Sequence, residues 1–150
     1  MAHEARVFLD TSVLFTAVFS EVGGSRLILK LGEAGALQLW VGPRVLQEAD
    51  AVLARKAAES KALFALLLDQ AKVSIGPAPD ETALAQARAV VDYPPDAHIV
   101  GEALAAGVDY LVSLDREHLV GNPRVLELPF AIGTPGDFLA WYREHVLDRV

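Results

Sequence analysis

Residues 96–115 read DAHIVGEALAAGVDYLVSLD and contain a helix followed by a buried strand, the unit on which the predicted fold rests. The spacing of the apolar residues predicts a helix from 96 to 106, and Gly107 is a typical helix stop. Residues 110–113 then form an almost wholly apolar run. A strand of this kind is buried on both faces, as in a parallel sheet covered by helices.

The same alternation of helices and strands extends outward from this unit across the rest of the chain. Further strands are predicted at 7–9, 37–41, 72–75 and 125–128. The other predicted helices cover 11–19, 26–34, 43–58, 61–71, 80–91 and 135–147. Strands that alternate with helices of about ten residues indicate βα units, and therefore an α/β fold with a central parallel sheet.

Length and composition favour a single folded domain over residues 1–150. Apolar residues make up 53% of the chain and charged residues 22%, which supports a packed core and excludes general disorder. The formal net charge is −7, and the whole excess of acid lies in residues 76–150. Bulk positive charge therefore cannot hold a nucleic acid here, whereas a nuclease with a local basic rim stays possible.

The chain has no cysteine, which excludes disulfides, thiolate zinc sites and cysteine nucleophiles. No stretch reaches the roughly 18 uncharged apolar residues that a membrane-spanning helix needs. The first residues do not have the pattern of a signal peptide. We therefore expect a cytoplasmic protein without a membrane partner.

Two acidic residues follow buried strands directly. Asp10 comes after the strand at 7–9, and Asp115 closes the strand at 110–113. Ligands of open parallel sheets bind beyond the carboxyl ends of the strands. Both carboxylates are therefore expected at a binding edge of the sheet.

Two more acids are expected to point inward from helices. At 100° per residue, Glu48 interrupts the apolar stripe of the helix at 43–58. Asp96 lies one turn before the apolar stripe of its own helix. Glu102, on the same helix, lies off that stripe and is expected to be solvated. His98 and His118 are interpreted as surface residues, with contact to the substrate as the alternative.

Each acid also has a structural interpretation. Asp10, Asp96 and Asp115 all precede helices, and aspartate is a favoured N-cap; Glu48 could pair with a nearby arginine. Together, however, four buried carboxylates repel one another unless a cation neutralises them. Oxygen ligands without cysteine suit Mg²⁺ or Mn²⁺, which can activate a water for phosphoryl chemistry.

Three segments together resemble the PIN-domain nucleases, and most closely the VapC-type toxins of toxin–antitoxin pairs. They are VFLDTSVL at 7–14, VLQE at 45–48, and the segment at 96–115. The likeness spans about residues 6–130. It implies a three-layer α/β/α sandwich and Mg²⁺- or Mn²⁺-dependent hydrolysis of RNA. It also implies a homodimer and an antitoxin as protein partner.

The resemblance assigns roles to individual residues. Asp10, Glu48, Asp96 and Asp115 match the four acids that hold the metal and carry catalysis. Ser12 and Ser113 match the small polar positions that orient these acids, and Glu117 stands where many members carry a further Asp. The chain departs from the family pattern in two places, since one extra residue lies between Asp92 and Asp96, and Glu117-His118 replaces the usual Asp-Phe.

The sequence defines the surfaces for substrate and partner less closely than the acids of the metal site. The expected phosphate contacts are Arg44, Arg26 and Lys30, with a solvated helix face as the alternative. The helix at 61–71 is apolar nearly all round, so it is either buried or meets a partner. A second candidate patch, or simply packing, comprises Phe138, Trp141 and Tyr142.

These observations predict a metal-dependent ribonuclease that serves as a toxin. Two alternatives stay open at this point. One is a PIN-like module that binds RNA or protein without catalysis, and the other is a housekeeping RNA-processing nuclease.

Overall fold

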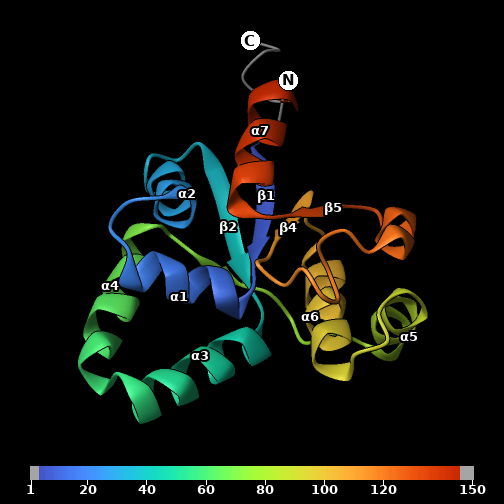
Figure 1. Ribbon diagram of the computed structural model, residues 1–150, viewed down its shortest axis with the longest axis horizontal. Helices are drawn as coiled ribbons and strands as arrows, with labels where there is room; N and C mark the ends of the chain where they lie inside the picture. Colours follow the sequence, from blue (N-terminus) through green and yellow to red (C-terminus); the bar gives the residue numbers. More distant parts are fainter. Residues whose placement is uncertain (1–3, 146–150) are drawn as a thin grey trace.

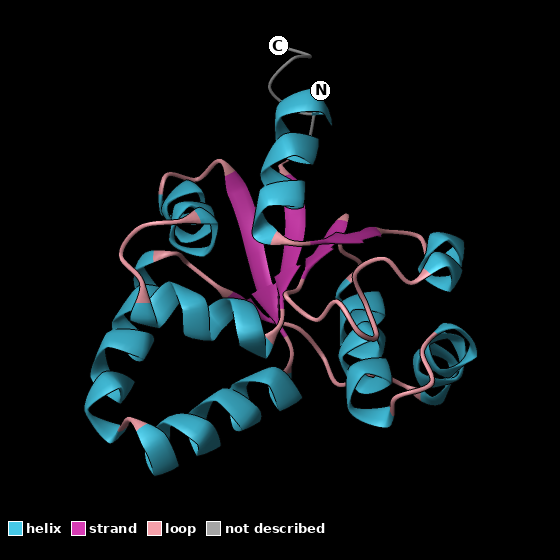
Figure 2. Ribbon diagram, viewed as in Figure 1, coloured by secondary structure: helices cyan, strands magenta, loops and turns pink. Residues whose placement is uncertain are grey.

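The computed structural model describes residues 4–145, which form a parallel sheet with helices on both faces (Figures 1 and 2). The strands lie in the order β3-β2-β1-β4-β5, and every pairing between neighbours is parallel. Their bounds are β1 (Ala5–Leu9), β2 (Leu37–Val41), β3 (Ser74–Ile75), β4 (Tyr110–Val112) and β5 (Ala131–Gly133).

Helices form the two outer layers. Their bounds are α1 (Thr11–Phe19), α2 (Gly24–Glu33), α3 (Pro43–Lys56), α4 (Lys61–Gln70), α5 (Glu81–Val90), α6 (Pro94–Ala106) and α7 (Pro135–His145). Two short 3₁₀ helices, η1 (Ala58–Ser60) and η2 (Pro123–Glu127), complete the described elements. Helices α1, α2, α4 and α7 form one group of neighbours, and α5 packs on α6 (Figure 1). The predicted α/β/α sandwich with a parallel sheet is confirmed.

The chain order of the strands reverses between β1 and β4. From β1 the chain moves to β2 and β3 on one side, then crosses to β4 and β5 on the other side. Such a switch point leaves a crevice beyond the carboxyl ends of the two central strands. Asp10 and Asp115 follow these two strands in the sequence, so both lie at this crevice.

The central strands are anchored in the core. Val7, Phe8 and Leu9 of β1 and Leu111 and Val112 of β4 have no measurable solvent exposure. Residues that follow such strands start from a rigid, fully packed backbone.

The last strand was predicted at the wrong place. Residues 125–128 do not form a strand, because Pro123–Glu127 is the 3₁₀ helix η2 and β5 follows at Ala131–Gly133. Asn122 caps η2 by accepting a hydrogen bond from the Arg124 N–H, at 3.0 Å. Val125 and Leu128 are buried, and their spacing of three suits a 3₁₀ turn.

Helix α6 begins earlier than predicted. The pair Pro94-Pro95 opens the helix, because the first turn of a helix needs no N–H donors. Asp96 therefore lies inside the first turn and is not the N-cap, a position that Tyr93 takes. The helix ends at Gly107, whose φ of 64° is left-handed, as the sequence predicted.

The aromatic residues of α7 are packing residues. Phe138 and Tyr142 are buried, and Trp141 lies against Tyr110 of β4 with ring centroids 5.2 Å apart.

In residues 4–145, no single helix has the length and hydropathy to cross a membrane. Helices α1 and α2 taken together meet these two criteria, but the pair is bent by 92° at its break.

Candidate metal centre

Asp10 is the most buried of the four predicted acids and is held by three donors. It is 4% exposed, and its Oδ1 accepts hydrogen bonds from Ser12 Oγ at 2.5 Å and from the Val13 N–H at 3.2 Å. Its Oδ2 accepts from Ser113 Oγ at 2.5 Å. Asp10 thus caps α1 and faces the crevice at the same time. Burial raises its pKa, although the hydroxyls of Ser113 and Ser12 oppose that effect.

Ser12 and Ser113 connect Asp10 to the loop that follows β4. The Asp115 N–H donates to Ser113 Oγ at 3.0 Å, and the Leu114 N–H donates to Ser12 Oγ at 3.2 Å. Each hydroxyl therefore binds the carboxylate on one side and the backbone of the β4 loop on the other. Two small polar side chains thus couple the ends of β1 and β4.

Asp96, Asp115 and His118 come together in the same crevice. One ligand atom from each of them lies within 4.8 Å of the other two. His118 Nδ1 is 3.0 Å from Asp96 Oδ2 and 3.3 Å from Asp115 Oδ2. Asp115 is oriented by its own turn, since its Oδ1 accepts from the N–H groups of Glu117 and His118 at 2.9 and 3.0 Å.

The two aspartates behave as a coupled pair. The pKa of Asp96 is raised to about 7, mainly by burial. A hydrogen bond with Asp115, the negative charge of Asp115 and that of Asp10 raise it further. The pKa of Asp115 is lowered: desolvation acts in the opposite direction, but the hydrogen bonds from Asp96 and His118 outweigh it. Without a cation, the pair therefore shares one proton near neutral pH.

The prediction that His118 is an ordinary surface residue was wrong. Its ring stacks on Tyr93, with centroids 4.4 Å apart and an interplanar angle of 13°, and its Nδ1 faces both aspartates. Desolvation disfavours its charged form, yet the hydrogen bond to Asp115 and the surrounding acids raise its pKa. The spacing of three residues from Asp115 within one turn was the available signal.

Glu48 lies at the rim of the crevice. Thr11 Oγ1, next to Asp10 in the chain, donates to Glu48 Oε2 at 3.2 Å. Arg44 Nε donates to Glu48 Oε1, also at 3.2 Å, and the Glu48 side chain stays 36% exposed. Glu48 is therefore paired with an arginine and hydrogen-bonded to the turn that carries Asp10, but it is not among the residues whose ligand atoms gather at Asp96, Asp115 and His118.

The prediction that Glu102 is solvated was wrong. It is 1% exposed and accepts a hydrogen bond from the Arg44 N–H at 2.8 Å, so it caps the first turn of α3 from a different helix. A Cβ at Gly42 would collide with the Glu102 carboxylate, so this carboxylate occupies the space that residue 42 leaves free. Burial raises the pKa of Glu102, while the backbone N–H groups of Arg44 and Val45 oppose the shift.

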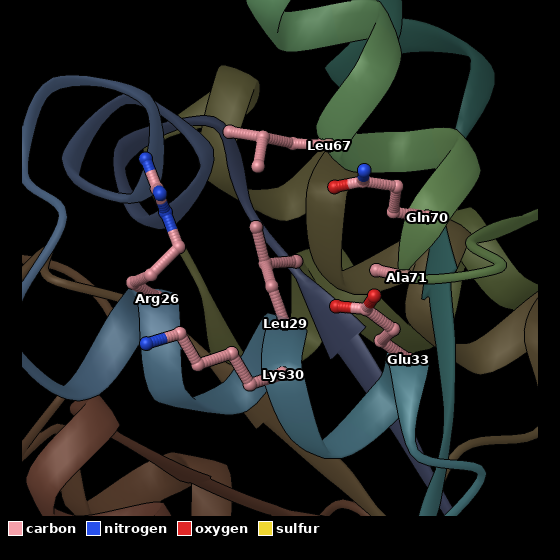
Figure 3. Close-up of a pocket in the computed structure, with 7 residues that line it drawn as sticks. All are labelled: Arg26, Leu29, Lys30, Glu33, Leu67, Gln70 and Ala71. Carbon is pink, nitrogen blue, oxygen red and sulfur yellow. The ribbon is translucent and has the colours of Figure 1, made fainter.

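Of the other predicted residues, Arg26 and Lys30 stand apart from the acids, whereas Glu117 lies beside them with its side chain exposed. Arg26 and Lys30 border a hollow between α2 and α4 that shares no residue with the acidic crevice (Figure 3). Arg26 Nε donates to the carbonyl of Ala17 at 2.8 Å. The side chain of Glu117 is 85% exposed, and its Oε1 lies 3.8 Å from His118 Nε2.

The donor set fits a divalent cation. Asp96 Oδ2 is buried and has no hydrogen-bond partner among the described residues, although the His118 ring is close. Asp10 and Asp115 present further carboxylates at the same crevice. Oxygen ligands of this type suit Mg²⁺ or Mn²⁺, and an imidazole is an additional ligand that a softer ion such as Mn²⁺ tolerates better.

The protein is thus an α/β/α sandwich with a parallel sheet and an acidic cluster after one of its central strands. The chain belongs to the PIN domain family, since the model of that family, described as "PIN domain", matches residues 6–117. Proteins of this family are generally nucleases and usually use divalent metals.

The fold has a counterpart among solved structures. The chain is similar to PAE2754 from Pyrobaculum aerophilum, with a TM-score of 0.55 and 16% identity. The match covers 91% of this chain and 88% of that one, and at this identity it establishes the fold alone. No curated protein matches the chain.

Proposed function

We propose that this protein is a ribonuclease that depends on Mg²⁺ or Mn²⁺. The observation that carries the proposal is the cluster after β4, where Asp96, Asp115 and His118 offer ligand atoms within 4.8 Å of one another. Asp10 is not part of this set but is joined to it, because Ser113 Oγ donates to Asp10 and accepts from the Asp115 N–H. Asp10 and Asp96 are buried, and a cluster of this charge is stable only with protons or cations bound to it.

In this proposal Asp10, Asp96 and Asp115 hold the metal, and Glu48 closes the site on the side of Arg44. A divalent cation held there would supply charge neutralisation at the phosphate and a water of lowered pKa. The residues of the chain provide the geometry. Ser12 and Ser113 fix the Asp10 carboxylate, and the N–H groups of Glu117 and His118 fix Asp115.

The reaction proposed is hydrolysis of a phosphodiester bond, with water as the attacking group. A water nucleophile does not involve the 2′-hydroxyl, so the acidic crevice itself is compatible with either sugar. The preference for RNA is supported by the resemblance to VapC-type toxins in the segments that carry Asp10, Glu48, Asp96 and Asp115.

The same resemblance supports the more specific proposal of a toxin with an antitoxin partner and a homodimeric state. Helix α4 offers a surface for such contacts, because Leu63 and Leu66 are 39% and 50% exposed while Phe64 and Leu67 are buried. A gene for a small DNA-binding protein beside this one would support the toxin; a gene neighbourhood of RNA-processing enzymes would favour the housekeeping alternative.

An RNA cleavage assay with purified protein tests the enzymatic proposal. We expect cleavage with Mg²⁺ or Mn²⁺, none with EDTA, and a loss of at least about a hundredfold in Asp10→Asn and Asp96→Asn. Circular dichroism would verify that both variants stay folded. Unchanged cleavage in both variants contradicts the proposal, and a wild type that binds RNA without cutting it would favour the non-catalytic alternative.

A further inference from the structure

A second polar hollow lies beside the acidic crevice, between the first turns of α3 and α6 and the body of α5. It encloses about 180 Å³ and is lined by Arg44, Leu84, Arg88, Pro94, Pro95 and His98. Since a water molecule occupies about 30 Å³ in the liquid, the hollow has room for a phosphate group.

The hollow and the crevice meet at one ion pair. Arg44 Nε lies 3.2 Å from Glu48 Oε1, and Glu48 is joined through Thr11 to the turn that carries Asp10. A polymer lying across Arg44 would therefore reach both places at once.

The lining of the hollow is basic. Arg44, Arg88 and His98 come from three different helices, and no acid is among the six lining residues. Arg44 and Arg88 carry the positive charge; burial and the two arginines lower the pKa of His98, which therefore contributes a neutral ring with one N–H donor. Even with Glu48 counted at the rim, two arginines face one carboxylate. On a chain of net charge −7, such a local surplus of positive charge is the place where a polyanion can approach.

The side chains are suited to phosphate oxygens. The ion pair with Glu48 engages Nε of Arg44, and its Nη groups can donate to two oxygens of one phosphate, as a second guanidinium can at Arg88. Pro94 and Pro95 form a wall whose backbone is rigid, which lowers the entropy lost on binding.

We propose that Arg44, Arg88 and His98 form a subsite for a backbone phosphate of single-stranded RNA, one that flanks the phosphate presented to the acids. The inference rests on the proposed ribonuclease function and extends it to the path of the substrate. It adds Arg88 and His98 to the expected contact Arg44.

Arg88→Ala is the test, because Arg88 is exposed and lies on α5, a helix that carries none of the four predicted metal acids. With a twelve-nucleotide single-stranded RNA, we expect KM to rise about fivefold to tenfold and kcat to stay within about twofold. The slope of log affinity against log salt concentration should fall by about 0.7, the value for one lost phosphate contact on a single strand. Arg88→Lys should restore most of this slope.

Arg143→Ala is the matched control, since Arg143 is an exposed arginine in the last turn of α7, at the end of the molecule remote from α3 (Figure 1). It removes the same charge and should change neither KM nor the salt slope. If Arg88→Ala equals the wild type, or if Arg143→Ala has the same effect as Arg88→Ala, the subsite is refuted.

The inference can be separated from the proposed activity. Binding of the same fluorescently labelled RNA, followed by anisotropy with Ca²⁺ in place of Mg²⁺, does not require turnover. If the wild type cuts no RNA but Arg88→Ala still loses affinity and salt slope, the subsite stands and the ribonuclease proposal fails. Equal affinity and slope in the two proteins refute the subsite whatever the activity.

Discussion

Helix α6 buries two carboxylates, and their surroundings differ in kind. Glu102, near the middle of the helix, accepts a hydrogen bond from the first turn of α3, where the positive end of a helix dipole stabilises an anion. Asp96, in the first turn, faces Asp115, Asp10 and His118. Each of the two carboxylates has one buried oxygen without a hydrogen-bond partner among the described residues, Oδ2 of Asp96 and Oε1 of Glu102. Glu102 has a partner within the fold, whereas Asp96 lies in an acidic crevice that a cation would complete.

This comparison gives a way to separate structural from functional acids. Burial alone does not distinguish them, because both residues are at most 8% exposed. What differs is the set of groups they face: Glu102 faces the backbone N–H groups at the start of α3 and one charged pair, Glu48 and Arg44, whereas the carboxylates of both Asp115 and Asp10 act on Asp96. A buried acid that faces other acids costs stability, so its retention indicates a role outside folding.

The largest expected effect is stabilisation by metal. At a Mn²⁺ concentration of about one hundred times Kd, the free energy of unfolding should rise by about 2.7 kcal/mol, because the ion binds only the folded state. Thermal denaturation with and without Mn²⁺ measures this. Glu102→Gln should keep the shift and Asp96→Asn should lose it; equal shifts in these two variants would contradict the distinction between the two acids.

Glu102→Ala tests the structural half of the comparison. Removal of a buried cap leaves the N–H groups of α3 unpaired, and we expect a loss of about 1–3 kcal/mol in the free energy of unfolding, measured by urea denaturation. Glu117→Ala is a suitable control because its side chain is largely exposed, and it should stay within about 0.5 kcal/mol of wild type. A Glu102→Ala protein as stable as the control would show that the cap contributes nothing.

The pH dependence of stability should carry the signature of Asp96. Its pKa rises from 3.8 to about 7 in the folded state, so the metal-free folded protein holds a proton that the unfolded chain has released. Stability should therefore fall as pH rises from about 4 to about 7, by about 1–2 kcal/mol after allowance for solvent screening.

Melting curves across this pH range, without metal, would measure the effect. Asp96→Asn should flatten the slope of stability against pH. The lowered pKa of Asp115 contributes stability of the opposite pH dependence, which is lost only below pH 3.8, the pKa of this group in the unfolded chain. If wild type and Asp96→Asn have parallel profiles, the proton is not held by this pair.

The smallest expected effect concerns the link between the crevice and its rim. Thr11→Val keeps the shape of the side chain and removes the hydrogen bond to Glu48. We expect the transition state to lose about 0.5–1 kcal/mol of stabilisation, which corresponds to a twofold to fivefold fall in kcat/KM for RNA. The melting temperature should stay nearly unchanged. Thr11→Ser, which keeps the hydroxyl, should retain the activity; a fall in Thr11→Ser as large as in Thr11→Val would exclude the hydrogen bond as the cause.

The features that could be predicted from the sequence are those that depend only on residues close together along the chain. Asp10 and Asp115 follow apolar strands, and any parallel sheet places such residues at its carboxyl edge. The positions of Gly107 as a helix end and of Pro43 in the first turn of α3 also follow from the conformations that these residues allow.

Two of the three errors share one physical origin, a partner from another part of the chain, and the third is local. Glu102 was placed by its angle to the apolar stripe of its own helix, but its partner is the N-terminus of α3, which the pattern of α6 does not encode. His118 was judged without Tyr93 and Asp96, which reach it from the start of α6. The run at 125–128 is too short for its periodicity to separate a strand from a 3₁₀ turn.

The sequence by itself determined the alternation of helices and strands, the parallel sheet and the acids at its edge, because these depend on local conformational preference and hydrophobic period. Only the tertiary structure decided which charges face one another. It paired Asp96 with Asp115 and His118, turned Glu102 inward as a cap, and placed Arg88 beside Arg44. The physical reason is that electrostatic partners act across a few ångströms of space, whatever distance separates them along the chain.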